Sequence, residues 1–177
     1  MNECWLSLDE YHERPAAVLG AWLTEPGWLT PRLREAGGRS GRFHLVGQKA
    51  LSLDGGLRTK LGVDDESGMM REIEFRCGDA RWMYAQTIFP RSTLGRFPWL
   101  AELGECALGE KLEGLSDVVR EPREYLELGE SHSLATAARL SGSSWARRAV
   151  FRLSGYAMLV TEVFMPDLGQ VQQVPVT

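Results

Sequence analysis

Residues 70–89 alternate between apolar and polar side chains, which is the pattern of a β-hairpin with one buried face. Gly78 and Asp79 at its centre favour a two-residue loop. With that loop, Arg71 lies opposite Gln86 and shares the apolar face of its strand. An arginine on such a face is costly to bury unless an anion meets it, so this hairpin indicates a charged ligand or partner.

A second hairpin is predicted for residues 147–165, around Ser154 and Gly155. A two-residue loop there places Arg147 opposite Glu162. The returning strand is largely apolar on both faces, as central strands are, and Glu162 is its only ionisable residue. Burial would raise the pKa of this carboxyl group, whereas a neighbouring arginine would lower it. Both registers depend on the loop length, because a slip by one residue exchanges the two faces of a strand.

The rest of the chain reads as short elements separated by turns. Capping and breaking residues predict short helices at 16–23, 30–36, 97–103 and 108–112. Extended segments are predicted at 42–53 and 125–128, with a turn at 54–56 and a loop at 63–68. Because hairpins outnumber long helices, we expect an α+β fold with a single antiparallel sheet and flanking helices. A chain of this length can also enclose an internal ligand cavity.

The composition is that of an ordinary globular domain. The chain has 177 residues, with 20 basic against 24 acidic side chains and a net charge of −4. We expect a single domain over residues 1–177, with 167–177 as a flexible tail. The mild acidity disfavours a nucleic-acid surface. The longest apolar run, 156–160, is too short for a membrane span, and the first residues lack the basic start of a signal peptide.

Several common catalytic signatures are absent from the sequence. There is no GxGxxG, Walker A, HExxH or GxSxG motif, and the three histidines are isolated from one another. A metal enzyme or a histidine-dependent hydrolase is therefore disfavoured. The three cysteines have no CxxC spacing, which favours a reduced, cytoplasmic setting.

Arg71 and Glu162 are the candidate functional residues, since each is a single charge on an otherwise apolar strand face. An arginine fork can hold a carboxylate through two parallel hydrogen bonds. A partly desolvated glutamate can move a proton near neutral pH. The alternative interpretation is structural, with Glu162 in an ion pair with either Arg71 or Arg147. Strand pattern alone leaves both interpretations open.

Several short motifs in a fixed order resemble those of a known protein family. They are REI at 71–73, TIFP at 87–90, STL at 92–94, LG at 103–104, ALG at 107–109, WARR at 145–148 and LVTEVFMP at 159–166. Their order and spacing resemble the chorismate lyase (chorismate pyruvate-lyase) family of ubiquinone biosynthesis, over roughly residues 20–166. The resemblance implies an enclosed cavity in which chorismate is converted to 4-hydroxybenzoate and pyruvate without a cofactor.

The resemblance also implies roles for particular residues. Arg71 matches the carboxylate-binding arginine and Glu162 the glutamate of the family. Leu108 matches a leucine whose backbone contacts the aromatic ligand, and Leu29 matches a second backbone contact, although less closely. The helices that carry these two leucines are expected to act as flaps that limit product release.

Two positions depart from the family pattern. Members usually carry an arginine where this chain has Gln86. The predicted register places Gln86 opposite Arg71 inside the pocket, so we expect one cation fewer for the two carboxylates of chorismate. Trp28 stands where a small residue is usual, and it is expected to narrow the entrance.

Two other functions remain open at this point. Ligand-sensing domains of the UTRA type in bacterial transcription regulators resemble this fold, and they bind small molecules without transforming them. A lyase that gives a different hydroxybenzoate isomer is the other possibility. For the enzyme we expect a monomer, with chorismate and 4-hydroxybenzoate as its small-molecule partners and with neither nucleic acid nor membrane as a partner.

Overall fold

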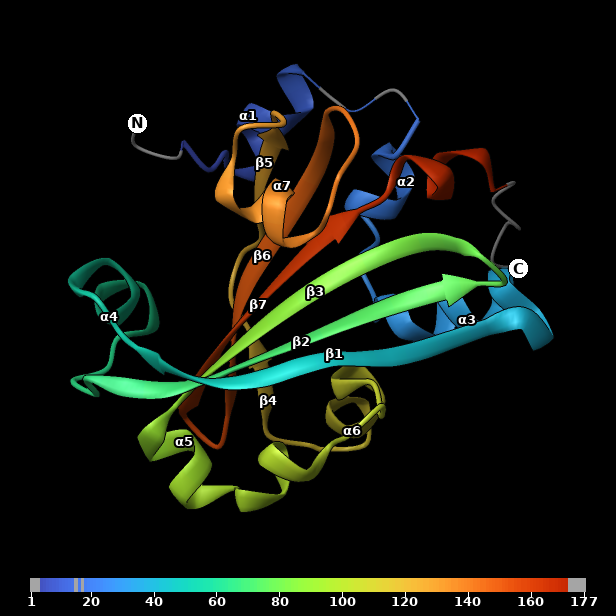
Figure 1. Ribbon diagram of the computed structural model, residues 1–177. Helices are drawn as coiled ribbons and strands as arrows, with labels where there is room; N and C mark the ends of the chain where they lie inside the picture. Colours follow the sequence, from blue (N-terminus) through green and yellow to red (C-terminus); the bar gives the residue numbers. More distant parts are fainter. Residues whose placement is uncertain (1–3, 15, 17, 172–177) are drawn as a thin grey trace.

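The computed structural model describes residues 4–14, 16 and 18–171, and these residues form one antiparallel sheet with helices on both faces (Figure 1). The strands run in the order β1-β2-β3-β7-β6-β4, and β5 also pairs with β6. They are β1 (Gly41–Ser52), β2 (Ser67–Cys77), β3 (Ala80–Pro90), β4 (Val118–Arg120), β5 (Glu124–Leu128), β6 (Ser144–Leu153) and β7 (Tyr156–Phe164). The predicted α+β class with a single antiparallel sheet is confirmed.

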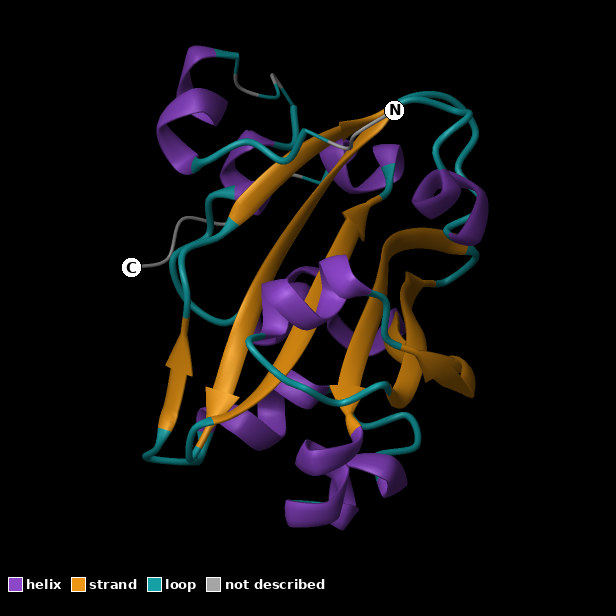
Figure 2. Ribbon diagram, turned by 90° about the vertical axis from the view of Figure 1, so that its left-hand side faces the viewer, coloured by secondary structure: helices purple, strands orange, loops and turns teal. Residues whose placement is uncertain are grey.

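The helices are short and divide between the two faces of the sheet. They are α1 (Leu8–Glu13), α2 (Gly20–Leu23), α3 (Leu29–Gly37), α4 (Gly55–Leu61), α5 (Arg91–Arg96), α6 (Leu108–Glu113) and α7 (Ser133–Ala137), with 3₁₀ turns η1 (Gly38–Ser40), η2 (Pro98–Glu102) and η3 (Pro166–Gln170). Apolar side chains of α3, α5 and α6 pack on one face, and those of α4 and α7 on the other. Figure 2 shows α4 crossing in front of the strands. None of the described helices is both long and apolar enough to cross a bilayer.

The second predicted hairpin has the expected register. Arg147 pairs with Glu162 across β6 and β7, and the loop is Ser154-Gly155. Both loop residues have positive φ, 48° and 85°, as a two-residue hairpin turn with the right twist requires. Strand β7 lies between β3 and β6, so its apolar character on both faces reflects a central position.

The first hairpin departs from the predicted register because of a bulge. The pairs next to the loop are as predicted, but the register shifts by one residue at Phe75. Arg71 therefore pairs with Thr87 rather than with Gln86. The bulge allows the consecutive apolar residues Trp82 and Met83 to join one buried cluster, which strict alternation would have prevented.

Helix α4 occupies the position of a predicted turn. Asp54 caps it by accepting a hydrogen bond from the Leu57 amide at 2.8 Å. Leu61 at its other end is fully buried and packs against Val150 and Leu159 of the sheet. The glycines after Asp54 suggested a turn in the sequence, but burial of this apolar side chain stabilises a helix.

Smaller differences concern the ends of elements. Helix α2 covers only the last part of the predicted helix 16–23, and α3 begins one residue earlier than expected, at Leu29. Within the predicted tail, Leu168 is fully buried in the core by η3, so this part packs against the domain. Residues 172–177 lie outside the described part of the chain.

Candidate active site

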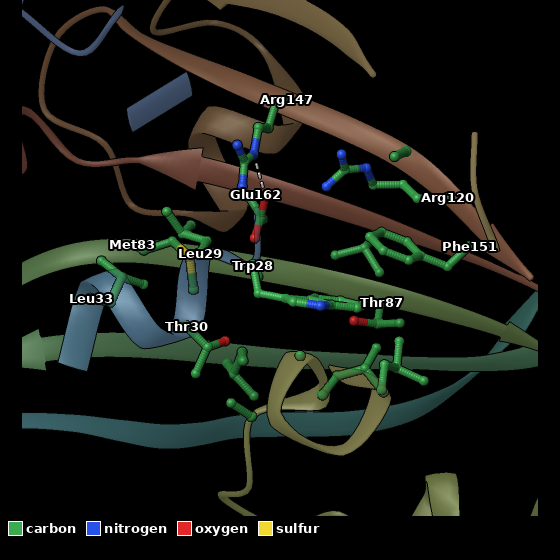
Figure 3. Close-up of a pocket in the computed structure, with 18 of the residues that line it drawn as sticks. Trp28, Leu29, Thr30, Leu33, Met83, Thr87, Arg120, Arg147, Phe151 and Glu162 are labelled. Carbon is green, nitrogen blue, oxygen red and sulfur yellow. Dashed lines mark hydrogen bonds and ion pairs between the residues drawn. The ribbon is translucent and has the colours of Figure 1, made fainter. Parts of the chain in front are cut away.

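An apolar cavity lies between the sheet and the starts of helices α3 and α6 (Figure 3). Its floor comes from β2, β3, β6 and β7, and its roof from the two helices. The apolar lining consists of Trp28, Leu29, Leu33, Phe43, Ile73, Met83, Ala85, Ala107, Leu108, Leu112, Ala149, Phe151 and Val160. A few polar side chains also line it, as is typical of ligand sites.

Glu162 is one of these polar groups, and it lines the cavity from β7. The Nε of Arg147 donates a hydrogen bond to its Oε2 at 2.6 Å. Arg147 is only 2% exposed, and its Nη1 donates to the carbonyl oxygens of Trp22 and Leu23. Of the two ion pairs considered from the sequence, the structure therefore forms the one with Arg147, and it leaves the Glu162 carboxylate at the cavity surface (Figure 3).

Arg71 lies immediately behind the wall of the cavity, and it does not itself line it. Its strand neighbour on the same face, Ile73, and its cross-strand partner, Thr87, are both wall residues. Its Nη2 donates to the carbonyl oxygens of Gly104 and Cys106, each at 2.7 Å. These two carbonyls belong to the loop that leads into α6, so Arg71 connects the sheet to the roof.

The remaining N–H groups of Arg71 have no hydrogen-bond partner in the described part of the chain. The side chain is 1% exposed, and its Nε and Nη1 have no hydrogen-bond partner among the described residues. Burial lowers the pKa of the guanidinium to about 10, which still leaves it charged at neutral pH. A buried cation with unsatisfied donors is unfavourable, so an anion that reached these donors would stabilise it.

Leu29 and Leu108 both line the cavity, and each is the first residue of its helix. Neither cap residue, Trp28 or Ala107, supplies a side-chain acceptor to the first turn. First-turn N–H groups have no partner within a helix, so those of α3 and α6 are available to a ligand. The helices meet closely at Gly109, where a Cβ atom would lie 2.8 Å from Thr30 Oγ1.

Gln86 does not belong to this cavity, which corrects the expectation from the sequence. The bulge in β3 places it opposite Glu72, on the face away from Arg71. Its Nε2 donates to the hydroxyl of Tyr84 at 2.9 Å, and that hydroxyl donates to Glu72. Burial and this contact with Glu72 both raise the pKa of Tyr84. The glutamine therefore removes no cation from the site.

Sequence reasoning missed two further cationic residues of the cavity, Arg120 and Arg123. They lie close together in the segment Arg120-Glu121-Pro122-Arg123. Its mixed charges are typical of an exposed loop, so they gave no sign of a cavity. Their proximity to Glu162 depends on how β4 and β5 both pair with β6. Trp28, in contrast, was singled out, and its ring stacks on Phe151 with centroids 5.6 Å apart.

The fold and the sequence both have relatives among known proteins. The effector domain of PhnF from Mycobacterium smegmatis superposes with a TM-score of 0.55 at 19% identity, covering 75% of this chain and 85% of that domain. The C-terminal domain of a histidine utilization repressor from Pseudomonas syringae gives 0.59 at 6% identity, covering 77% and 99%. At these identities the likeness shows a shared fold.

The sequence comparison is more specific. A probable chorismate pyruvate-lyase of Ralstonia nicotianae is 38% identical, over 88% of this chain and 87% of the relative. One of Dechloromonas aromatica is 35% identical over 85% and 88%, and the chorismate pyruvate-lyase of Serratia proteamaculans is 31% identical over 92% and 85%. The model of the chorismate lyase family matches residues 1–173, and the chain therefore belongs to that family.

Proposed function

We propose that this chain is a chorismate pyruvate-lyase, which eliminates pyruvate from chorismate to give 4-hydroxybenzoate, the ring precursor of ubiquinone. The observation that carries the proposal is the buried fork of Arg71, with two unpartnered nitrogen atoms, directly behind an apolar cavity that holds Glu162. Membership of the family supports the same reaction.

Arg71 would bind the ring carboxylate of the substrate. Its Nε and Nη1 each keep an N–H without a partner among the described residues, and either can donate a charge-assisted hydrogen bond to a carboxylate oxygen. The carbonyls of Gly104 and Cys106 hold the other end of the fork in place, so little side-chain entropy remains to be lost on binding. The ring then lies among the apolar residues of the cavity.

Glu162 would act at the opposite end of the ring. Arg147 holds one carboxylate oxygen, which fixes the orientation of the group. We assign to it a hydrogen bond with the C4 hydroxyl region and assistance to the proton that leaves C4. In the reaction this C–H bond breaks, the ring becomes aromatic, and the C3–O bond breaks toward oxygen. The released enolate takes up a proton on its methylene carbon and becomes pyruvate, so the elimination balances without a redox partner.

The backbone at the starts of α3 and α6 would complete the site. The first-turn N–H groups near Leu29 and Leu108 would donate to the ligand's oxygens. Because both helices form the roof, they must move for the product to leave, and we expect their movement to limit turnover. A burst of product in the first turnover, followed by a slower steady state, is the kinetic signature of that limit.

The remaining parts of the proposal concern the setting of the enzyme. We expect a cytoplasmic monomer, because the cavity is formed within one chain and Cys4, Cys77 and Cys106 are free thiols. Among the described residues no group of His, Cys, Asp and Glu side chains is arranged to hold a metal ion. We propose chorismate and its products as the partners, with neither nucleic acid nor membrane involved.

Pyruvate release from chorismate tests the assignment of residues. Glu162→Gln should lower kcat by roughly a hundredfold or more, as loss of a proton-transfer group does. The matched control is Glu127→Gln, on an exposed position of β5. Arg71→Ala should raise the dissociation constant of 4-hydroxybenzoate, whereas Arg39→Ala at the surface should not. Turnover near that of the wild type in both site variants would refute the assignment.

A ligand-sensing role is the second candidate, because the solved structures of similar fold are effector domains of regulators. The product profile separates the candidates. Incubation of the purified protein with chorismate should give 4-hydroxybenzoate, identified by chromatography and absorbance. A ligand-induced rise in melting temperature without turnover would favour the sensor, and another hydroxybenzoate isomer would favour a related lyase.

A further inference from the structure

The cavity carries more positive charge on its Glu162 side than the protein itself neutralises. Arg120 and Arg123 line the cavity together with Arg147, Arg148 and Glu162. Arg147 pairs with Glu162 and Arg148 with Glu124, but neither Arg120 nor Arg123 forms an ion pair with any described residue. Figure 3 shows the guanidinium of Arg120 beside Phe151, on the same side of the cavity as Glu162.

Backbone carbonyls are the only protein partners of these two guanidinium groups in the described chain. Arg120 donates to Pro26 at 2.8 Å and more weakly to Gly27. Arg123 donates to Gly27 at 3.0 Å and also to Glu25. A carbonyl oxygen carries only a partial charge, so these contacts leave both cations without a full counter-charge. The Nε atoms of both residues make no hydrogen bond to any described residue.

The position of the pair is at the boundary of the cavity. Both arginines also border a second, more open hollow on the surface, which is lined by the segment around α1 and the start of β5. They therefore form the wall between the interior and the outside, together with Pro26 and Gly27 of the facing segment.

The electrostatic environment agrees with the geometry. Burial, together with the neighbouring charges of Arg147 and Arg120, lowers the pKa of Arg123 to about 10. Glu162 acts in the opposite direction but is shared with Arg147. Three guanidinium groups around one carboxylate thus leave this wall short of an anion.

We propose that Arg120 and Arg123 bind the second carboxylate of chorismate, the one on the enolpyruvyl side chain. This inference rests on the proposed function, because that function places the ring carboxylate on Arg71 and carbon C4 near Glu162. The enolpyruvyl ether is attached at C3, next to C4, so its carboxylate must lie on the Glu162 side of the cavity. That side is the one formed by the two arginines.

The assignment explains how substrate and product are distinguished. Chorismate carries two carboxylates, whereas 4-hydroxybenzoate retains only the one on Arg71. After the C3–O bond breaks, the contact with Arg120 and Arg123 belongs to pyruvate alone.

The test compares the affinities for a ligand with two carboxylates and a ligand with one. Calorimetry measures the dissociation constants of chorismate and 4-hydroxybenzoate in a Glu162→Gln background, where turnover is suppressed. Replacement of both arginines (Arg120→Gln with Arg123→Gln) should weaken chorismate binding by roughly ten- to a hundredfold, the loss expected for charge-assisted contacts. The affinity for 4-hydroxybenzoate should change by less than about threefold.

Two controls separate ligand binding from a structural role. Arg152→Gln removes an arginine that pairs with Glu121 away from the cavity, and it should change neither affinity. Replacement of both wall arginines by lysine keeps the charges and should restore most of the chorismate affinity. If the affinities for chorismate and 4-hydroxybenzoate fall together, the arginines only hold residues 25–27, and the inference is overturned. An unchanged affinity for chorismate overturns it as well. The lyase assignment is tested separately, with Glu162 intact. If that protein releases no pyruvate although the double variant loses affinity for chorismate alone, the lyase assignment is overturned and the carboxylate site is supported.

Discussion

Replacement of Arg71 by methionine should separate the stability of the protein from its affinity for the product. Methionine has a similar length and no charge, so it removes the guanidinium while largely filling its space. Two effects on the unliganded protein oppose each other. The carbonyls of Gly104 and Cys106 lose their donors, but the cost of burying a cation with two unpartnered nitrogen atoms disappears as well.

The sizes of these effects are comparable. Burial lowers the pKa of Arg71 from 12.5 to about 10, which corresponds to about 3 kcal/mol against the charged form at neutral pH. Leaving the two carbonyls without donors costs about 1–3 kcal/mol each, or about 2–6 kcal/mol together. We therefore expect the free energy of unfolding to change by no more than about 3 kcal/mol, a small effect for a charged residue that is 1% exposed.

The affinity for the product, in contrast to the stability, should change strongly. A charge-assisted hydrogen bond to the ligand carboxylate is lost, at about 1.5–3 kcal/mol, so the affinity for 4-hydroxybenzoate should fall at least about tenfold. Urea unfolding of the unliganded protein and calorimetric titration measure the two quantities. A destabilisation above about 4 kcal/mol with retained product affinity would show that Arg71 supports the fold rather than the ligand, and would refute the reasoning.

Three further predictions concern the roof and the charged residues. Gly109→Ala should destabilise the fold by about 1–3 kcal/mol and weaken product binding, because the new Cβ would lie 2.8 Å from Thr30 Oγ1. Chemical denaturation measures the stability and calorimetric titration the affinity. The control is Gly114→Ala, whose new Cβ would meet nothing within 4 Å. Trp28→Leu removes the stack on Phe151 and should speed product dissociation several-fold, since the ring contact is worth about 0.5–1.5 kcal/mol; stopped-flow displacement with an unchanged rate would contradict this. Burial raises the pKa of Glu74, but hydrogen bonds from its arginine partners lower it more, so its folded-state pKa is below the unfolded value. Its stabilisation is therefore complete above pH of about 4.5 and is lost as the pH falls below that, and Glu74→Gln should flatten the acid side of the stability profile.

The registers of the two hairpins show how far sequence reasoning could go. The second could be derived fully, because its turn residues and its apolar pattern agree on one pairing. The first could not, because nothing local announces the bulge at Phe75, which arises from the burial of two consecutive large side chains, Trp82 and Met83, in one core. The error in the position of Gln86 follows directly from this single shift.

The candidate site divides in the same way. Arg71 and Glu162 stand out as charges on apolar strand faces, a local signal that requires only the two-residue period. Arg120 and Arg123 carry no such signal, since they lie at the end of one strand and just before another, and only the three-dimensional pairing brings them to the cavity.

The segment of residues 22–27 is held beside the cavity through its main-chain oxygens rather than through particular side chains. Arg120, Arg123 and Arg147 all reach carbonyls between Trp22 and Gly27, and any amino acid supplies such an oxygen. Substitutions in that stretch can therefore accumulate at little cost to the contact, provided that the chain keeps its path. The side chains of this segment could therefore change during evolution to suit a different ligand, while the three arginines that contact its backbone stay in place.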